Sequence, residues 1–122
     1  MTIEELRIRI DELDRQLVEL LSERARAAQM IGHLKAATSL PVYEPNREKI
    51  IYANVRAANK GPLPDIELTH IYERIIDVMR ALQRNELASQ RHAQAAEQEG
   101  GAMGHAAGAP IDGPAPETGK KS

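Results

Sequence analysis

The feature that most constrains the fold of this chain is a long run of apolar residues near its beginning. The run alternates between three- and four-residue spacing and comprises Ile3, Leu6, Ile10, Leu13, Leu17, Leu20, Ala27, Ile31 and Leu34. This is the pattern of a helix packed along a coiled-coil-like seam. Thr2 and Glu5 form a capping box at its start, and Pro41 stops it. The pattern therefore predicts one long first helix.

Two further helices are predicted from helix-start and helix-stop residues. A second begins at Glu44-Pro45, since proline suits the first helical position, and ends at Asn59-Lys60-Gly61-Pro62. A third begins after Pro64 with Asp65 as its cap and fades between Leu87 and Ala96. Its apolar residues at helical spacing are Ile71, Ile75, Val78 and Leu82. The predicted fold class is all-α, with three helices per chain.

The length of the first helix implies a partner. About 35 residues at roughly 1.5 Å each make a rod of about 50 Å. A compact domain of about 90 residues has a diameter of only roughly 30 Å. The rod would overhang a monomer and leave its aliphatic stripe in water, and a second copy of the chain is the simplest cover. We therefore expect an intertwined homodimeric helical bundle.

The end of the chain differs in composition from the rest. Residues 97–122 hold six of the eight glycines and three of the seven prolines, with few large apolar side chains. Such a segment buries too little surface to offset the entropy of ordering it. We predict a helical domain over residues 1–96 and a disordered Gly/Pro/Ala-rich tail over residues 97–122.

Composition excludes several classes of function. The chain has no cysteine, which excludes disulfides and thiolate metal sites. Its acidic start is unlike a signal peptide, and no apolar run suffices to span a membrane. The net charge of −2 argues weakly against a nucleic-acid partner. His92 and His105 have no companions at metal-ligand spacing. We expect a cytoplasmic protein with no metal, no cofactor, and neither a membrane nor nucleic acid as partner.

Two cations occupy notable positions on the first helix. Arg24 falls in register between Leu17 and Ile31, where the seam calls for an aliphatic side chain. Lys35 lies eleven residues further on, within roughly 20° of the same face. Arg24 could instead pack its stem at the edge of the seam with its head in water. Lys35 could be a solvated lysine that complements the helix dipole. Neither residue is specific by itself.

Further polar residues lie on the other two helices. Glu44, Arg47 and Glu48 crowd the first turn of the second helix, where they could simply be solvated or favour the helix dipole. Gln83 continues an apolar face of the third helix that contains Ile76, Met79 and Leu87. A glutamine in such a stripe is a packing fault unless its amide finds a partner.

Together these residues indicate a bound anion. The cations Arg7, Arg24, Lys35 and Arg47 outnumber the two acids Glu44 and Glu48, and buried charges need a counter-charge. These residues lie within the segments Leu6-Arg7, Ile10-Asp11-Glu12-Leu13-Asp14, Leu20-Leu21-Ser22-Glu23-Arg24, Ile31-Gly32-His33-Leu34-Lys35, Pro41-Val42-Tyr43-Glu44-Pro45-Asn46-Arg47-Glu48 and Gln83. In their order and spacing these segments closely resemble the all-helical (AroQ-type) chorismate mutases over about residues 3–90.

The resemblance implies an activity and roles for individual residues. The reaction would be the rearrangement of chorismate to prephenate, in the biosynthesis of phenylalanine and tyrosine, without a cofactor. Arg24, Arg47 and the Arg7 of a partner chain would grip the two substrate carboxylates. Lys35 and Gln83 would donate to the ether oxygen.

Three further positions complete the comparison with the family. Glu48 would accept a hydrogen bond from the substrate hydroxyl. Glu44 stands where many members have aspartate, so it would hold either that hydroxyl or the first turn of the second helix. Met79 replaces a small polar residue of some members, and any carboxylate contact of that residue is lost. Residues 59–63 resemble members fused to prephenate dehydratase or DAHP synthase, although here we expect a free-standing enzyme that could form a complex with another aromatic-pathway enzyme.

Other functions remain open at this stage. A lyase of the same fold that releases pyruvate from isochorismate would share the arginines and the lysine. A non-catalytic helical module that binds an aromatic-pathway enzyme would not need inward cations, and a plain coiled coil would not have its seam broken at Arg24. The rearrangement needs no proton transfer and no nucleophile, which fits a chain without a recognisable Ser-His-Asp set or an acid–base carboxylate pair.

Overall fold

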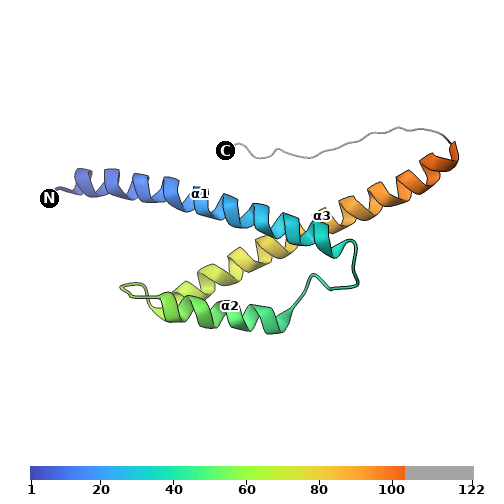
Figure 1. Cartoon of the computed structure of the whole chain (residues 1–122). Coiled ribbons are helices and arrows are strands. Elements are labelled where there is room, and N and C mark those ends of the chain that lie inside the picture. Colours follow the sequence, from blue (N-terminus) through green and yellow to red (C-terminus); the bar gives the residue numbers. More distant parts are fainter. Residues whose placement is uncertain (104–122) are drawn as a thin grey trace. The chain divides into compact units, whose positions relative to one another are not determined.

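The computed structural model describes the backbone of residues 1–103 and the side chains of residues 1–97. It contains three helices, which are α1 (Ile3–Lys35), α2 (Pro45–Ala58) and α3 (Asp65–Met103), as Figure 1 shows. No strand occurs within residues 1–103. The all-α prediction is therefore confirmed. Of the predicted tail, residues 104–122 lie outside the described residues.

The start of α1 lies where the sequence predicts it, whereas the helix ends at Lys35, before the predicted stop at Pro41. At the start, the Thr2 amide donates to Glu5 Oε1 at 2.9 Å and the Glu5 amide donates to Thr2 Oγ1 at 3.0 Å, which completes the capping box. At the end, the Thr38 hydroxyl donates to the Lys35 carbonyl at 3.2 Å and accepts from the Leu40 amide at 3.2 Å. These contacts close the last turn with a local side chain, as threonine commonly does.

The connection between α2 and α3 is held by one asparagine. The Asn59 side-chain amide donates to the Leu63 carbonyl at 2.8 Å and to Asp65 Oδ1 at 2.7 Å. Gly61 has a φ of 73°, a conformation that glycine adopts without steric cost. The prediction of Asp65 as the α3 cap is wrong, because the Leu68 amide already bonds to the Pro64 carbonyl at 3.0 Å. Asp65 is instead the first helical residue, and its carboxylate faces Asn59.

The end of α3 also differs from the prediction. The helix continues to Met103, past the expected fading between residues 87 and 96 and past the predicted start of the tail at residue 97. The apolar stripe ends near Leu87, but residues 88–99 are mainly alanine, glutamine, glutamate and arginine, which are strong helix formers. Residues 88–99 are therefore helical although they present no apolar face.

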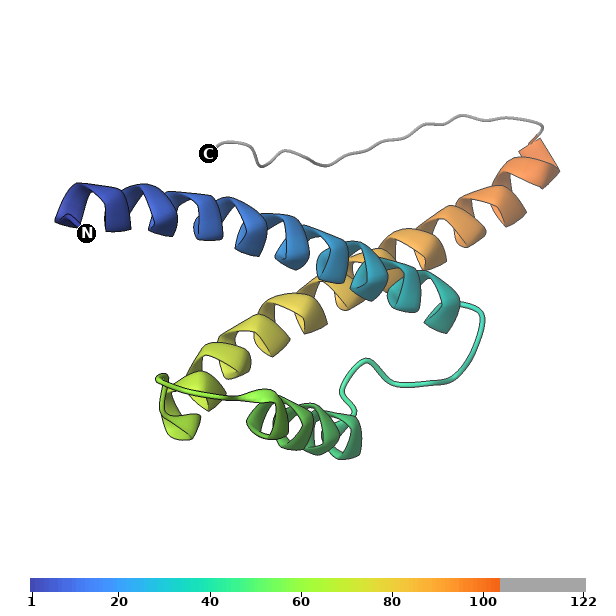
Figure 2. The same ribbon diagram turned by 60° about the vertical axis from the view of Figure 1, so that its left-hand side comes forward.

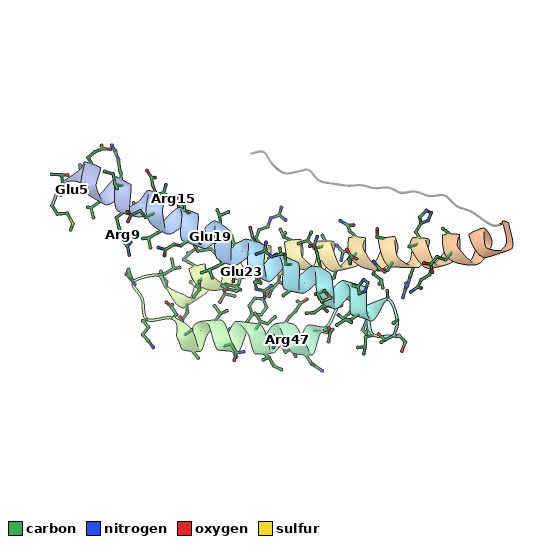
Figure 3. All side chains as sticks on the ribbon, turned by 45° about the horizontal axis from the view of Figure 1, so that its top comes forward. Glu5, Arg9, Arg15, Glu19, Glu23 and Arg47 are labelled. Carbon is green, nitrogen blue, oxygen red and sulfur yellow. The ribbon has the colours of Figure 1, made fainter. Side chains whose placement is uncertain are left out.

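The three helices meet within the compact unit of residues Met1–Ala88. Its buried apolar residues are few, namely Ala28 of α1 and Ile76 and Met79 of α3. Residues 1–23 are all exposed, and the first half of α1 projects away from α2 and the beginning of α3 (Figure 2). Side chains such as Glu5, Arg9 and Arg15 line this projecting part (Figure 3). The aliphatic stripe of α1 thus lies uncovered in a single chain.

Glycine permits the close approach of α1 and α3. A Cβ atom added to Gly32 would lie 2.7 Å from the Gln83 carbonyl oxygen and 2.9 Å from the Gln83 Cα. Both are main-chain atoms, which cannot give way by a rotamer change. Gly32 therefore allows the end of α1 to rest directly on the α3 backbone at Gln83, beside the polar residues described next.

Candidate active site

All three helices contribute to one cleft within residues 1–88. The cleft is open to solvent and has an apolar floor that includes Ile76 and Met79. Its polar and charged lining residues are Arg24 of α1, Glu44 before α2, Arg47 and Glu48 of α2, and Arg80 and Gln83 of α3. Five of these six are residues that the sequence predicted for the site.

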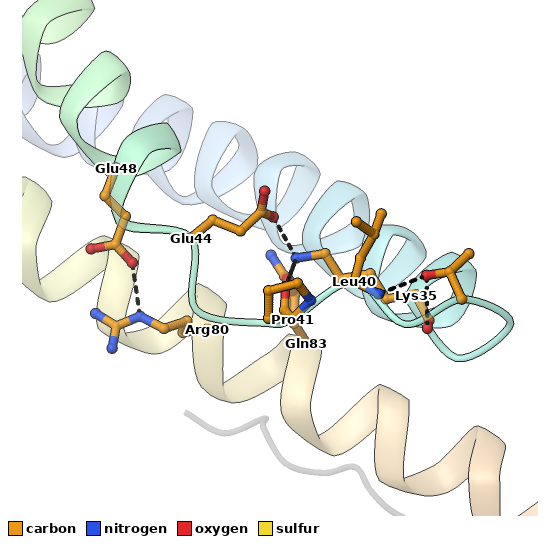
Figure 4. Close-up of polar contacts among 8 residues, drawn as sticks. Lys35, Leu40, Pro41, Glu44, Glu48, Arg80 and Gln83 are labelled. Carbon is orange, nitrogen blue, oxygen red and sulfur yellow. Dashed lines mark hydrogen bonds and ion pairs between the residues drawn. The ribbon is translucent and has the colours of Figure 1, made fainter.

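A further predicted site residue, Lys35, lies against the cleft lining and is buried, with an exposure of 4%. Its Nζ donates to the Pro41 carbonyl at 2.7 Å, to Glu44 Oε2 at 2.5 Å and to Gln83 Oε1 at 3.1 Å, as Figure 4 shows in part. An ammonium has three donors, and these contacts use all of them. Lys35 is thus an inward cation, and its interpretation as a solvated lysine is wrong.

The contact with Lys35 fixes the direction of the Gln83 amide. Because the Gln83 oxygen accepts from Lys35, the Gln83 nitrogen is left as a donor at the cleft. The interaction joins residues 48 positions apart in the chain, on α1 and α3. The amide that would be a packing fault in an apolar stripe therefore has a charged partner.

Glu44 uses its carboxylate for Lys35 rather than for the helix that follows it. It occupies the N-cap position of α2, yet its side chain makes no capping hydrogen bond. Of the two roles predicted for Glu44, the local one of holding the first turn of α2 is not seen. The Glu44 carboxylate instead supplies the counter-charge of a buried ammonium.

Arg24 and Arg47 differ from Lys35 in having no partner within the described part of the chain. Arg24 is half-buried on α1 and Arg47 is exposed on α2, and both line the cleft. Neither forms an ion pair or hydrogen bond with any residue whose side chain is described. Guanidinium groups bind carboxylates through two parallel hydrogen bonds. Two such groups at one cleft suit a ligand with more than one carboxylate.

Glu48 is paired with Arg80, a residue that the sequence analysis missed. Arg80 Nε lies 3.1 Å from Glu48 Oε2, with side-chain exposures of 26% and 17%. Arg80 also donates from Nη2 to Asp77 Oδ1 at 2.8 Å, and its guanidinium lies 5.3 Å from the centre of the Tyr43 ring. The sequence does place Arg80 on the same helical face as Ile76 and Gln83, because it follows Ile76 by four residues and precedes Gln83 by three.

The carboxylates near Arg80 affect a neighbouring tyrosine. The pKa of Tyr52 is raised by burial and by the negative charges of Glu73, Glu48 and Asp77, while Arg80 opposes the shift. Burial and nearby negative charge both disfavour the phenolate. Arg80 is thus the cation that moderates a locally negative region at this side of the cleft.

Arg7 lies apart from the other predicted site residues. It is on the projecting part of α1, where its side chain is 69% exposed and lies 3.8 Å from Glu4. It does not line the cleft of its own chain. The prediction that it serves a partner chain is consistent with this position, and it stays a prediction.

Within the part of the chain that the structure describes, no three His, Cys, Asp or Glu residues are grouped so that they could hold a metal ion. No described helix combines the length and apolar character needed to cross a membrane.

Comparison with known proteins gives one consistent result. Residues 6–84 match the family model of chorismate mutase type II. The chain is 37% identical over 86 residues to the bifunctional chorismate mutase/prephenate dehydratase of Aquifex aeolicus, which covers 67% of this chain and 24% of that protein. It is 32% identical over 84 residues to the chorismate mutase of Methanocaldococcus jannaschii, covering 68% and 85% respectively. The chain thus spans about a quarter of the bifunctional relatives it matches.

A solved structure extends the similarity to three dimensions. The crystal structure of chorismate mutase from Helicobacter pylori in complex with prephenate aligns with a TM-score of 0.64 and 32% sequence identity. The alignment covers 70% of this chain and 93% of that one. The fold that positions the cleft is therefore the fold of these helical proteins.

Proposed function

The chain belongs to the family of type II chorismate mutases, and from this premise we propose that it converts chorismate to prephenate. In this intramolecular rearrangement one carbon–oxygen bond breaks as one carbon–carbon bond forms. The substrate is a flexible dianion that must fold over its own ring. An enzyme for it has to fix that shape and stabilise the negative charge that gathers on the ether oxygen.

The observation that carries the proposal is the charge arrangement at the cleft. Lys35 is paired with Glu44, and Arg80 is paired with Glu48 and Asp77, whereas Arg24 and Arg47 have no partner among the residues with described side chains. The unpaired Arg24 and Arg47 carry two positive charges, which match the two negative charges of the substrate. We assign the grip on the two substrate carboxylates to Arg24 and Arg47, because bidentate contacts fix orientation as well as charge.

Lys35 and Gln83 are the donors to the ether oxygen. Their mutual contact at 3.1 Å brings an ammonium and an amide together at one point of the cleft wall. Since Lys35 already makes three hydrogen bonds, donation to the substrate requires exchange of one of them, and the longest of the three is the bond to Gln83. That exchange would aim both side chains at the same oxygen. Each donor to a developing oxyanion is worth about 3–4 kcal/mol of barrier.

The two carboxylates of the cleft, Glu44 and Glu48, have different roles. Glu44 holds the Lys35 ammonium at 2.5 Å and so sets the position of the main cationic donor. Glu48 is free of contacts other than its ion pair with Arg80 within the described residues, so its remaining lone pairs can accept from the substrate hydroxyl.

The site is completed by a second copy of the chain. The apolar stripe of α1 is exposed, with Ile3 at 68% and Leu17 at 55%, and Arg7 lies on this stripe-bearing part of the helix. Arg7 and Lys35 are 28 residues apart, about 42 Å along one helix, so they cannot reach one small ligand in the same chain. If two α1 helices cross antiparallel near residue 21, Arg7 of one copy comes opposite Lys35 of the other. We therefore assign Arg7 to the site of the partner.

Product identification tests the proposed function. The purified protein is incubated with chorismate, and in parallel with isochorismate, and the products are identified by NMR. Prephenate from chorismate supports the proposal. Pyruvate released only from isochorismate would instead show a lyase of the same fold, and no turnover of either substrate would show a non-catalytic module.

A further inference from the structure

We propose that Arg80 is a positioning residue that holds the Glu48 carboxylate in place and compensates its charge beside the dianionic substrate. The inference rests on the proposed function, in which Glu48 accepts from the substrate hydroxyl. Neither the sequence pattern nor the role of any other cleft residue assigns a task to Arg80.

The geometry shows that Arg80 is itself held from three sides. Its Nε contacts Glu48 at 3.1 Å, its Nη2 donates to Asp77 at 2.8 Å, and its guanidinium lies over the Tyr43 ring at 5.3 Å (Figure 4 for the Glu48 contact). Asp77 lies one turn earlier on α3, whereas Tyr43 lies in the segment before α2. A guanidinium fixed by a carboxylate and an aromatic face is pre-organised as a partner for a second carboxylate.

The contact with Glu48 is an ion pair rather than an aligned hydrogen bond. The Arg80 Nε is buried, and its N–H does not point at an acceptor oxygen. Charge therefore dominates the interaction, and the Glu48 lone pairs are not consumed by a donor. This arrangement compensates the carboxylate while leaving it able to accept from a ligand.

The charge balance of the cleft explains why such a cation is needed. Arg24, Lys35, Arg47 and Arg80 carry four positive charges, and the carboxylates paired with them, Glu44, Glu48 and Asp77, carry three negative charges. Without Arg80 this excess of one positive charge disappears, and a mostly buried Glu48 with 17% exposure would face a dianion with no counter-charge. An unpaired carboxylate in partly buried surroundings is strongly unfavourable and repels an anionic ligand.

This role predicts a particular kinetic defect. The hydroxyl contact of Glu48 is made both in the bound substrate and in the transition state, so its disturbance raises KM more than it lowers kcat. Arg80→Leu should therefore lower kcat/KM about tenfold, mainly through KM, in the range seen when a group that orients a ligand-binding side chain is removed. Arg84→Leu is the matched control, since Arg84 is an exposed arginine of α3 that does not line the cleft, and it should stay within about twofold of the wild type.

A double-mutant cycle between Arg80→Leu and Glu48→Gln provides the test. Kinetic constants for chorismate are measured for the wild type, both single variants and the double variant, and circular dichroism compares their helix content. If Arg80 acts through Glu48, Arg80→Leu costs about tenfold in the wild-type background and less than about twofold when Glu48 is already neutral. Should Arg80→Leu unfold, the cycle is run with Arg80→Lys, which keeps the charge but not the fork and should cost about threefold.

The possible outcomes distinguish a failure of the positioning role of Arg80 from a failure of the proposed function. Equal losses from Arg80→Leu in both backgrounds would overturn the positioning role, as would a loss confined to kcat. A wild-type protein that makes no prephenate would refute the proposed function before the cycle is begun.

Discussion

Substitution of Gly32 by alanine has two opposing effects on the free energy of unfolding, and the size of each is known. Alanine is favoured over glycine within a helix by about 1 kcal/mol. Against this, the new Cβ would lie 2.7 Å from the Gln83 carbonyl oxygen and 2.9 Å from its Cα. Overpacking costs about 1–3 kcal/mol, and the upper end applies here because main-chain atoms cannot rotate away. We expect a net loss of about 2 kcal/mol in the free energy of unfolding.

Thermal unfolding followed by circular dichroism measures this loss. At about 4–8 °C per kcal/mol for a domain of this size, the melting temperature should fall by about 10 °C. The protein concentration is held constant because assembly would shift the midpoint. Gln29 is exposed on the same helix, so the difference between Gln29→Gly and Gln29→Ala isolates the propensity term as a control.

The same substitution also separates α1 from α3 at the point where Lys35 reaches Gln83. Turnover of the folded Gly32→Ala protein should therefore fall as well, because a displacement of about 1 Å in a catalytic group can cost a hundredfold in rate. A Gly32→Ala variant that gains the stability expected from helix propensity alone and keeps full activity would refute the close approach of the two helices.

Three further predictions concern the cleft residues. Lys35→Ala should lower kcat by about a hundredfold or more with a helical fold retained, because it removes a donor to the ether oxygen; near-native turnover would exclude Lys35 from the site. Gln83→Glu should make activity rise toward acid pH, because a carboxyl group donates only when protonated and repels the developing charge when ionised; a rate profile as flat between about pH 5 and 8 as that of the wild-type amide would exclude Gln83. Mixed Arg7→Ala and Lys35→Ala proteins should recover roughly a quarter of wild-type activity after subunit exchange, because about half of the dimers are mixed and each carries one site with neither defect; no recovery despite verified exchange would contradict a shared site.

Local signals in the sequence predicted much of the fold. The capping box of Thr2 and Glu5 and the proline at position 45 each act within one helical turn, and the structure confirms both. Apolar periodicity does not predict the end of α3, because the strong helix formers of residues 88–99 continue the helix without an apolar face. The prediction of Asp65 as the α3 cap is wrong because the Pro64 carbonyl already accepts the first helical hydrogen bond.

Prediction of the site was limited by contacts between distant parts of the chain. Spacing on one helical face singled out Arg24 and Lys35, and the resemblance to a family supplied the remaining positions. No sequence pattern could show that Lys35 would donate hydrogen bonds to Pro41, Glu44 and Gln83, because these contacts depend on how the segment before α2 folds back. The helical face of Arg80 could be read from the sequence, but its contacts with Glu48 and Tyr43 could not, because these residues lie in and just before α2.

The most direct test of the central claim is the initial rate of prephenate formation from chorismate by three proteins. These are the wild type, Arg24→Ala and Arg26→Ala, where Arg26 is an exposed arginine two residues further along α1 that does not line the cleft. Both substitutions keep a good helix former and remove one positive charge, so they differ only in whether the cleft loses an unpaired guanidinium. We expect Arg26→Ala to match the wild type within about twofold and Arg24→Ala to lose about a hundredfold in kcat/KM, the cost of a lost bidentate contact to a carboxylate. Equal rates for the two variants would contradict the claim that this cleft binds the dianion.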